Sequence, residues 1–124
     1  KASDMMRSRF GSVPSQMRLA DFIENQLMQS PQLLWPVLEE DRLVGLVTLA
    51  EVRNVPVDER EVTPIGRIMR TDLTALSIEP DTDARRVLDI LGTGSVPLAV
   101  VERGRVLGLL SAADAAKWVL LHQR

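Results

Sequence analysis

The chain has 124 residues, 45% hydrophobic and 26% charged, which fits one compact domain or two small repeats and is too apolar for a disordered chain. Its 17 acidic and 15 basic side chains are interspersed and give a formal charge of −2. This argues against a nucleic-acid partner, because phosphate binding draws on clustered Lys and Arg. Cysteine is absent, which excludes a disulfide framework, a thiolate metal site and a cysteine nucleophile.

The longest apolar stretches, 43–50 and 106–113, fall far short of the roughly 20 residues of a membrane helix. We therefore expect that this segment does not span a membrane. It begins at Lys1 without an initiator Met or a signal-peptide pattern, so we expect a piece of a longer protein. The lack of cysteine leaves the redox compartment open and is compatible with a reducing one, and we expect the cytoplasmic side.

Alternating and helical hydrophobic patterns predict the elements in chain order. The first set is a leading strand at 11–13, a helix near 19–27, a strand pair at 35–38 and 43–47, and a helix after residue 48. The second set is a leading strand at 74–78, a helix at 84–91, a strand pair at 98–101 and 106–110, and a helix at 112–122. Gly92-Thr93-Gly94 is predicted to end the helix before it.

The two sets are copies of one unit. A shift of 63 residues lays 37–48 over 100–111 without a gap and places Glu51 on Asp114 and Met6 on Met69. The middle of each copy needs a two-residue slip. The sequence thus predicts two strand-helix-strand-strand-helix repeats, 1–58 and 59–124, with a polar connector at about 54–64.

The same short motif follows the second strand of each pair. Thr48 and Glu51 in the first copy, and Ser111 and Asp114 in the second, form a hydroxyl-x-x-acid pattern that is typical of a helix capping box. Capping does not exclude ligand binding, because a helix start that opens a cleft is a polar site for a hydroxyl or a phosphate.

The order of these motifs resembles the cystathionine-beta-synthase domain, or CBS domain. The residues that carry the resemblance are the Pro-Asp turn 79–82, the Pro-Val strand 35–37 and the Gly-apolar-apolar-Ser/Thr-x-x-acid motif, which occurs twice. The resemblance covers 4–121 and implies an α+β tandem CBS-domain pair, or Bateman module. Its two βαββα repeats would pack through their sheets with pseudo-twofold symmetry and leave two clefts.

In that family the clefts often bind adenosine-containing ligands such as AMP, ATP or S-adenosylmethionine. The resemblance implies that Asp114 holds the ribose hydroxyls and that Ser111 lies near phosphate. Thr48 and Glu51 would form the weaker site, since Glu51 departs from the pattern by one methylene. The opposing wall of the Asp114 cleft is expected near Ser3–Met6 and Gln32–Leu34, which gives Met6 and Leu34 as further ligand-binding candidates.

The remaining candidates for a functional role are Trp35, His122 and any catalytic group. Trp35 is either a core side chain or a side chain that narrows the cleft against an adenine. His122, the single histidine, is expected to be a solvated residue at a helix end, since one His without Cys cannot build the usual zinc site. No nucleophile and base can be assembled, so we predict no catalytic residues, no metal site and no cofactor in this segment.

Two functions remain open. The first is a regulatory module that binds an adenosine-containing ligand and controls a parent protein. The alternative is a ligand-free structural dimerisation module whose clefts are filled by its own side chains. A homodimer formed through CBS packing is expected in either case.

The stretches 52–56 and 63–69 resemble the linker of CBS pairs fused behind bacterial site-2-protease-like membrane zinc metallopeptidases. This resemblance implies a parent that is an integral membrane protein, with zinc only in its own catalytic domain.

Overall fold

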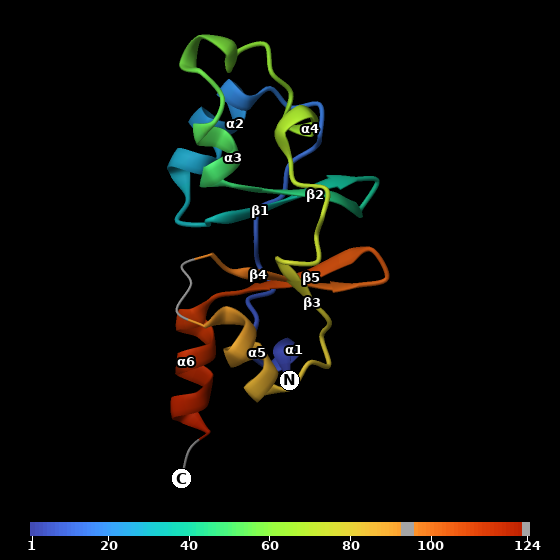
Figure 1. Ribbon diagram of the computed structural model, residues 1–124, viewed down its shortest axis with the longest axis vertical. Helices are drawn as coiled ribbons and strands as arrows, with labels where there is room; N and C mark the ends of the chain where they lie inside the picture. Colours follow the sequence, from blue (N-terminus) through green and yellow to red (C-terminus); the bar gives the residue numbers. More distant parts are fainter. Residues whose placement is uncertain (93–95, 123–124) are drawn as a thin grey trace. The chain divides into compact units, whose positions relative to one another are not determined.

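The computed structural model describes residues 1–92 and 96–122 and contains short helices and two small sheets (Figure 1). The elements up to residue 73 are α1 (Ala2–Met5), α2 (Leu19–Asn25), the 3-10 turn η1 (Leu27–Gln29), β1 (Leu34–Glu39), β2 (Arg42–Thr48), α3 (Leu49–Arg53), the 3-10 turn η2 (Val57–Glu59) and α4 (Ile65–Ile68). The remaining elements are β3 (Ser77–Ile78), α5 (Ala84–Leu91), β4 (Leu98–Glu102), β5 (Arg105–Leu110) and α6 (Ala112–Leu121). The predicted α+β class is confirmed.

The chain folds into two compact units. Gly11–Leu73 forms the unit that we call the Thr48 unit. Lys1–Phe10 and Thr74–Arg124 together form the Asp114 unit. Each unit has its own apolar core, so each is described by itself.

In the Thr48 unit, the antiparallel pair β1–β2 is covered on one face by α2, α3 and α4 (Figure 1). The strands turn one set of alternate side chains toward these helices, because successive residues of a strand point to opposite faces. The core side chains from the strands are Trp35, Val37 and Val47, and the helices add Leu19, Phe22, Val52 and Ile65.

The Asp114 unit repeats this design around a three-stranded sheet. β3 pairs with β4 in parallel and β4 pairs with β5 in antiparallel orientation, with α1, α5 and α6 on one face (Figure 1). The core side chains from β4 and β5 are Leu98, Val100 and Leu110, and the helices add Ala2, Met5, Val87, Leu91 and Ala115.

The 63-residue repeat is present in the geometry. Trp35, Val37 and Val47 occupy the places of Leu98, Val100 and Leu110 in the two cores. The strand register also shifts after Val37 in one hairpin and after Val100 in the other. Equivalent irregularities at equivalent positions confirm that the two units are copies of one fold.

The leading strand predicted at 11–13 is reduced to one bridge, in which Val13 pairs in parallel with Val37. The Val13 amide donates to the Pro36 carbonyl (3.0 Å), and the Leu38 amide donates to the Val13 carbonyl (2.9 Å). Pro14 follows directly and has no N–H to continue the ladder. The corresponding prediction at 74–78 is confirmed for Ser77–Ile78.

Each compact unit includes a segment from the start of the other repeat. Residues 1–10 of the first repeat belong to the Asp114 unit, and residues 64–73 of the second repeat belong to the Thr48 unit. The amides of Ala2 and Ser3 donate to the carbonyls of Thr82 (2.7 Å) and Pro80 (3.0 Å) in the Asp114 unit. In the same way, the amides of Ile65 and Gly66 donate to Met17 (2.9 Å) and Ser15 (2.8 Å) in the Thr48 unit.

The compact units therefore differ from the consecutive repeats 1–58 and 59–124. The sequence repeat groups residues that are similar to one another, whereas the compact unit groups residues that pack around the same core. Here 1–10 shares its core with the second repeat, and 59–73 shares its core with the first.

The predictions for Trp35 and for the end of the helix at 84–91 can be compared with the structure. Trp35 is a core side chain: its ring meets Phe22 edge to face at 5.2 Å, and its Nε1 donates to the Gln32 carbonyl (3.0 Å). α5 ends at Leu91, and Gly92 follows with φ 52°, a conformation that favours glycine. Thr93 and Gly94, also predicted to end this helix, lie outside the described residues.

Candidate functional site

The start of α6 presents Asp114 beside Ser111, its capping residue. The Asp114 amide donates to Ser111 Oγ (3.1 Å). In return, Asp114 Oδ2 accepts from Ser111 Oγ (2.9 Å) and from the Ser111 amide (3.3 Å). The predicted capping box is confirmed, and it fixes the Asp114 carboxylate at the first turn of the helix.

A second side chain meets the same carboxylate from the N-terminal segment. Arg7 Nε donates to Asp114 Oδ1 at 2.8 Å and forms an ion pair with it. The side chain of Asp114 is 10% exposed, whereas that of Arg7 is 68% exposed. The Asp114 carboxylate is thus mostly buried, whereas the Arg7 side chain that pairs with it is largely exposed to solvent.

Backbone contacts place Arg7 next to β5. Arg7 and Leu109 exchange two hydrogen bonds, from the Arg7 amide (2.8 Å) and from the Leu109 amide (2.9 Å). Gly108 permits this approach, because a Cβ there would lie 2.7 Å from both the Arg7 carbonyl oxygen and Met6 Sδ. The segment that carries Arg7 therefore contacts β5 at a position, Gly108, where a side chain would clash with it.

The surroundings of Asp114 act on its pKa in two directions. Partial burial raises the pKa, but the hydrogen bonds from Arg7 and Ser111 and the positive charge of Arg7 lower it more. The net result is a pKa below the usual value for an aspartate. The same pairing raises the pKa of Arg7, through its hydrogen bond and its charge interaction with Asp114.

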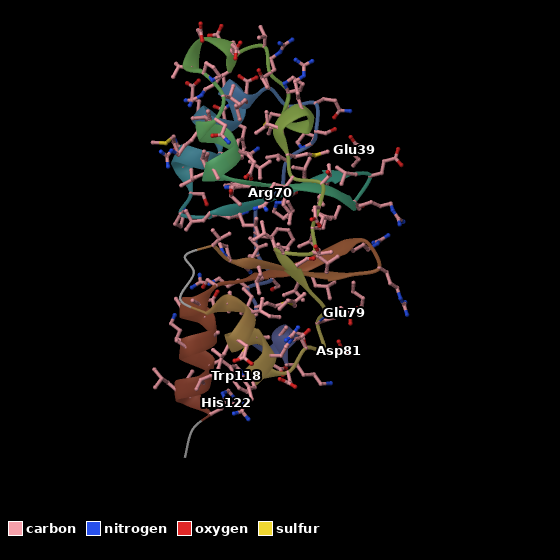
Figure 2. All side chains as sticks on the ribbon, viewed as in Figure 1. Glu39, Arg70, Glu79, Asp81, Trp118 and His122 are labelled. Atoms are coloured by element: carbon pink, nitrogen blue, oxygen red, sulfur yellow. The ribbon has the colours of Figure 1, made fainter. Side chains whose placement is uncertain are left out.

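The Thr48 unit has the equivalent helix start without the equivalent ion pair. Glu51 Oε1 accepts from the Thr48 amide (2.7 Å) and from Thr48 Oγ1 (3.0 Å), which completes the predicted capping box of α3. Arg70, labelled in Figure 2, pairs with Leu46 as Arg7 pairs with Leu109. Among the residues that the structure describes, Arg70 and Glu51 form no ion pair.

The structure places the candidate residues in two groups. Met6, Ser111 and Asp114 lie together in the Asp114 unit, with Met6 against Gly108. Leu34 lies opposite Thr48 in the β1–β2 register, so it belongs with Glu51 in the Thr48 unit. Ser3–Met6, which the repeats assigned to the first copy, is part of the compact unit that holds Asp114.

Sequence reasoning missed Arg7. The signal was available, because the shift that places Met6 on Met69 also places Arg7 on Arg70. The repeated Met-Arg pair marks equivalent positions of the two units, and Arg7 is the member of the pair that forms an ion pair with a capping acid among the described residues. What the shift cannot supply is that Arg7 pairs with the acid of the second repeat, since that depends on the packing of the N-terminal segment.

Two further polar features belong to neither helix start. A hollow of about 570 Å³ borders the β1–β2 turn near Gln16, Glu39 and Arg42, at the far end of β2 from Thr48. His122 is exposed just after α6, where its ring stacks on Trp118 with a centroid distance of 4.1 Å (Figure 2).

Within 1–92 and 96–122, no three His, Cys, Asp or Glu residues gather as metal ligands, and no helix is long and apolar enough to cross a membrane.

Comparison with known proteins gives concordant results. Residues 65–121 match the family model of the CBS domain. Curated relatives from two strains of Mycobacterium tuberculosis, called zinc metalloprotease Rip3, are 28% identical over 123 residues, which is 96% of this chain. The chain spans only 31% of the length of these relatives.

Solved structures share the whole fold. Protein MJ1004 from Methanocaldococcus jannaschii is 29% identical with a TM-score of 0.80, over 98% of this chain and 60% of its own. CBSX2, solved in complex with AMP, is 19% identical with a TM-score of 0.83, over 99% of this chain and 98% of its own. The family match identifies 65–121 as a CBS domain, and the doubled fold and the repeated capping motif give the whole chain the fold of a tandem CBS pair.

Proposed function

We propose that this CBS pair binds an adenosine-containing ligand at the start of α6 and thereby regulates a parent protein. The observation that carries the proposal is the Asp114 carboxylate, which is fixed by Ser111 at a helix start and is only 10% exposed. A carboxylate held in this way can accept hydrogen bonds from the two adjacent hydroxyls of a ribose.

Two further observations support an adenosine ligand. CBSX2, which shares the fold over nearly the whole length of both chains, was solved with AMP. In addition, the dipole of the ten-residue helix α6 favours an anionic group at the start of this helix.

The test is calorimetric titration of the chain with AMP and with 2′-deoxy-AMP, which keeps the phosphate and lacks the vicinal diol. We expect AMP to bind more tightly, and Asp114→Asn to remove most of that preference while it keeps the shape of the side chain. Glu51→Gln is the matched control in the other unit and should change AMP binding less. Failure of millimolar AMP, ATP and S-adenosylmethionine to bind or to raise the melting temperature contradicts the proposal.

We further propose that the parent is a membrane zinc metalloprotease of the site-2 type. The support is the similarity to Rip3, whose length this chain covers by 31%. The complete reading frame provides the test. Upstream hydrophobic segments and a His-Glu-x-x-His motif are expected, and a reading frame that lacks both contradicts this attribution.

A dimerisation module is the second candidate, and a specific surface favours it. The Asp114 unit exposes large apolar side chains on its helices, namely Leu88, Ile90, Leu120 and Leu121. Light scattering of the free chain tests this role. A dimer that Leu120→Glu dissociates and Lys117→Glu leaves intact supports it, whereas a monomer at all concentrations contradicts it.

A further inference from the structure

The acceptor capacity of Asp114 is nearly filled by the protein itself. An ionised carboxylate offers about four lone-pair sites to hydrogen-bond donors. Asp114 accepts one bond from Arg7 at Oδ1 and two from Ser111 at Oδ2, which is three bonds in all. One site remains, whereas a ribose diol that donates from both hydroxyls needs two. One of the present donors must leave before the diol can bind in this manner.

The donors differ in how easily they leave. Ser111 contributes its amide and its hydroxyl to the capping box, and their removal would unpair the first turn of α6. Arg7 contributes the end of a long side chain that is 68% exposed, and the hydration of its guanidinium offsets the loss of one solvated ion pair. Arg7 is therefore the donor that a ligand displaces.

The displaced guanidinium needs a new anion if the exchange is to be favourable. A planar guanidinium binds phosphate with two parallel hydrogen bonds, and a phosphorylated nucleotide brings such a group together with its ribose. Unphosphorylated adenosine would break the ion pair between Arg7 and Asp114 without supplying a new anion for Arg7. The charge of Arg7 is thus compensated before and after binding only when the ligand carries a phosphate.

We infer that Arg7 is a specificity-determining residue that exchanges the Asp114 carboxylate for the ligand's phosphate and so selects nucleotides over nucleosides. This inference rests on the proposed binding of an adenosine-containing ligand at Asp114. It also explains why the ion pair is placed at an otherwise sheltered carboxylate, since an unpaired Asp114 would accept any diol.

The experiment compares AMP with adenosine by calorimetry, for the unaltered chain and for Arg7→Ala and Arg7→Gln. Removal of the exposed ion pair should let adenosine bind about two- to fivefold more tightly. Loss of the phosphate partner should weaken AMP binding by about three- to tenfold. The preference for AMP over adenosine should then fall by about six- to fiftyfold in both variants.

Arg85→Ala is the matched control, because it removes one positive charge from an exposed position of α5 in the same unit. It should leave the AMP-to-adenosine preference unchanged. Arg7→Lys keeps the charge without the planar fork and should retain part of the preference.

The outcomes separate the two proposals. Binding of AMP with the same preference in Arg7→Ala as in the unaltered chain overturns the role of Arg7 and leaves the site at Asp114 standing. An equal loss in Arg85→Ala shows a general charge effect and also overturns it. Absence of binding of AMP and adenosine to the unaltered chain and to the Arg7 variants overturns the binding function itself, and the inference with it.

Discussion

Arg7 donates a 2.8 Å hydrogen bond from Nε to Oδ1 of Asp114 across 107 positions of the sequence. This contact joins the N-terminal segment to the helix start that carries the candidate ligand site. The same carboxylate caps α6 through Ser111, so one group serves the stability of the helix and the proposed recognition of a ligand. Four predictions follow from this site and from the repeats around it.

Asp114 should make the stability of the protein depend on pH. Its pKa is lower in the folded chain than the usual value of about 3.9, so near pH 4 the folded state binds fewer protons than the unfolded state. The stabilisation is present above that pH and is lost as the pH falls through the folded-state pKa. Because Arg7 is solvated, we expect this contribution to be small.

Urea unfolding between pH 7 and pH 2.5 measures this contribution. Asp114→Asn cannot titrate, so its unfolding free energy should fall less over this range than that of the unaltered chain. Molar salt should shrink the difference by screening the ion pair. Equal pH dependence of the two proteins would falsify the assignment.

Ser111→Ala should cost about 1 kcal/mol of unfolding free energy, because it removes the side-chain acceptor for the Asp114 amide. Thr48→Ala removes the equivalent cap of α3, which accepts from the Ala50 amide at 3.3 Å, and should also destabilise. Chemical denaturation measures both losses. Ser111→Thr keeps the hydroxyl and serves as the control, and it should stay near the unaltered value.

Gly108→Ala should destabilise the Asp114 unit by about 1–3 kcal/mol, because the new methyl group meets backbone that cannot move aside alone. Its Cβ would lie 2.7 Å from the Arg7 carbonyl oxygen. Gly45→Ala is the matched substitution in the Thr48 unit, where the three atoms nearest to the added Cβ all belong to the side chain of Met69. Thermal melting should show the smaller loss for Gly45→Ala, and the reverse order would contradict this account.

Asp41→Gly should stabilise the chain by roughly half a kcal/mol. Asp41 has φ 67° in the β1–β2 turn, and the repeat places it on Gly104, which has φ 78° in the β4–β5 turn. A side chain is strained in this conformation and glycine is not. Gly104→Asp should lower the melting temperature in return, and a gain in stability from Gly104→Asp would refute this explanation.

Much of the fold was readable from local patterns. The apolar runs at 35–38 and 98–101 indicated strands, because strand periodicity acts over a few residues. The capping boxes at Thr48 and Ser111 were readable for the same reason. The one-residue bridge at Val13 was not anticipated, although Pro14 beside it marks the end of any ladder.

The sequence by itself determined the repeat, most of the strands and helices and the acid that ends each motif, since these depend on neighbours and on a fixed shift along the chain. Only the tertiary structure decided which segment completes which core and that Arg7 reaches Asp114. The segments 1–10 and 64–73 carry a Met-Arg pair at the same place of the repeat, so the sequence leaves open which repeat each of them packs against. Hydrogen bonds such as that from Ala2 to Thr82, which join residues far apart in the chain, select one arrangement.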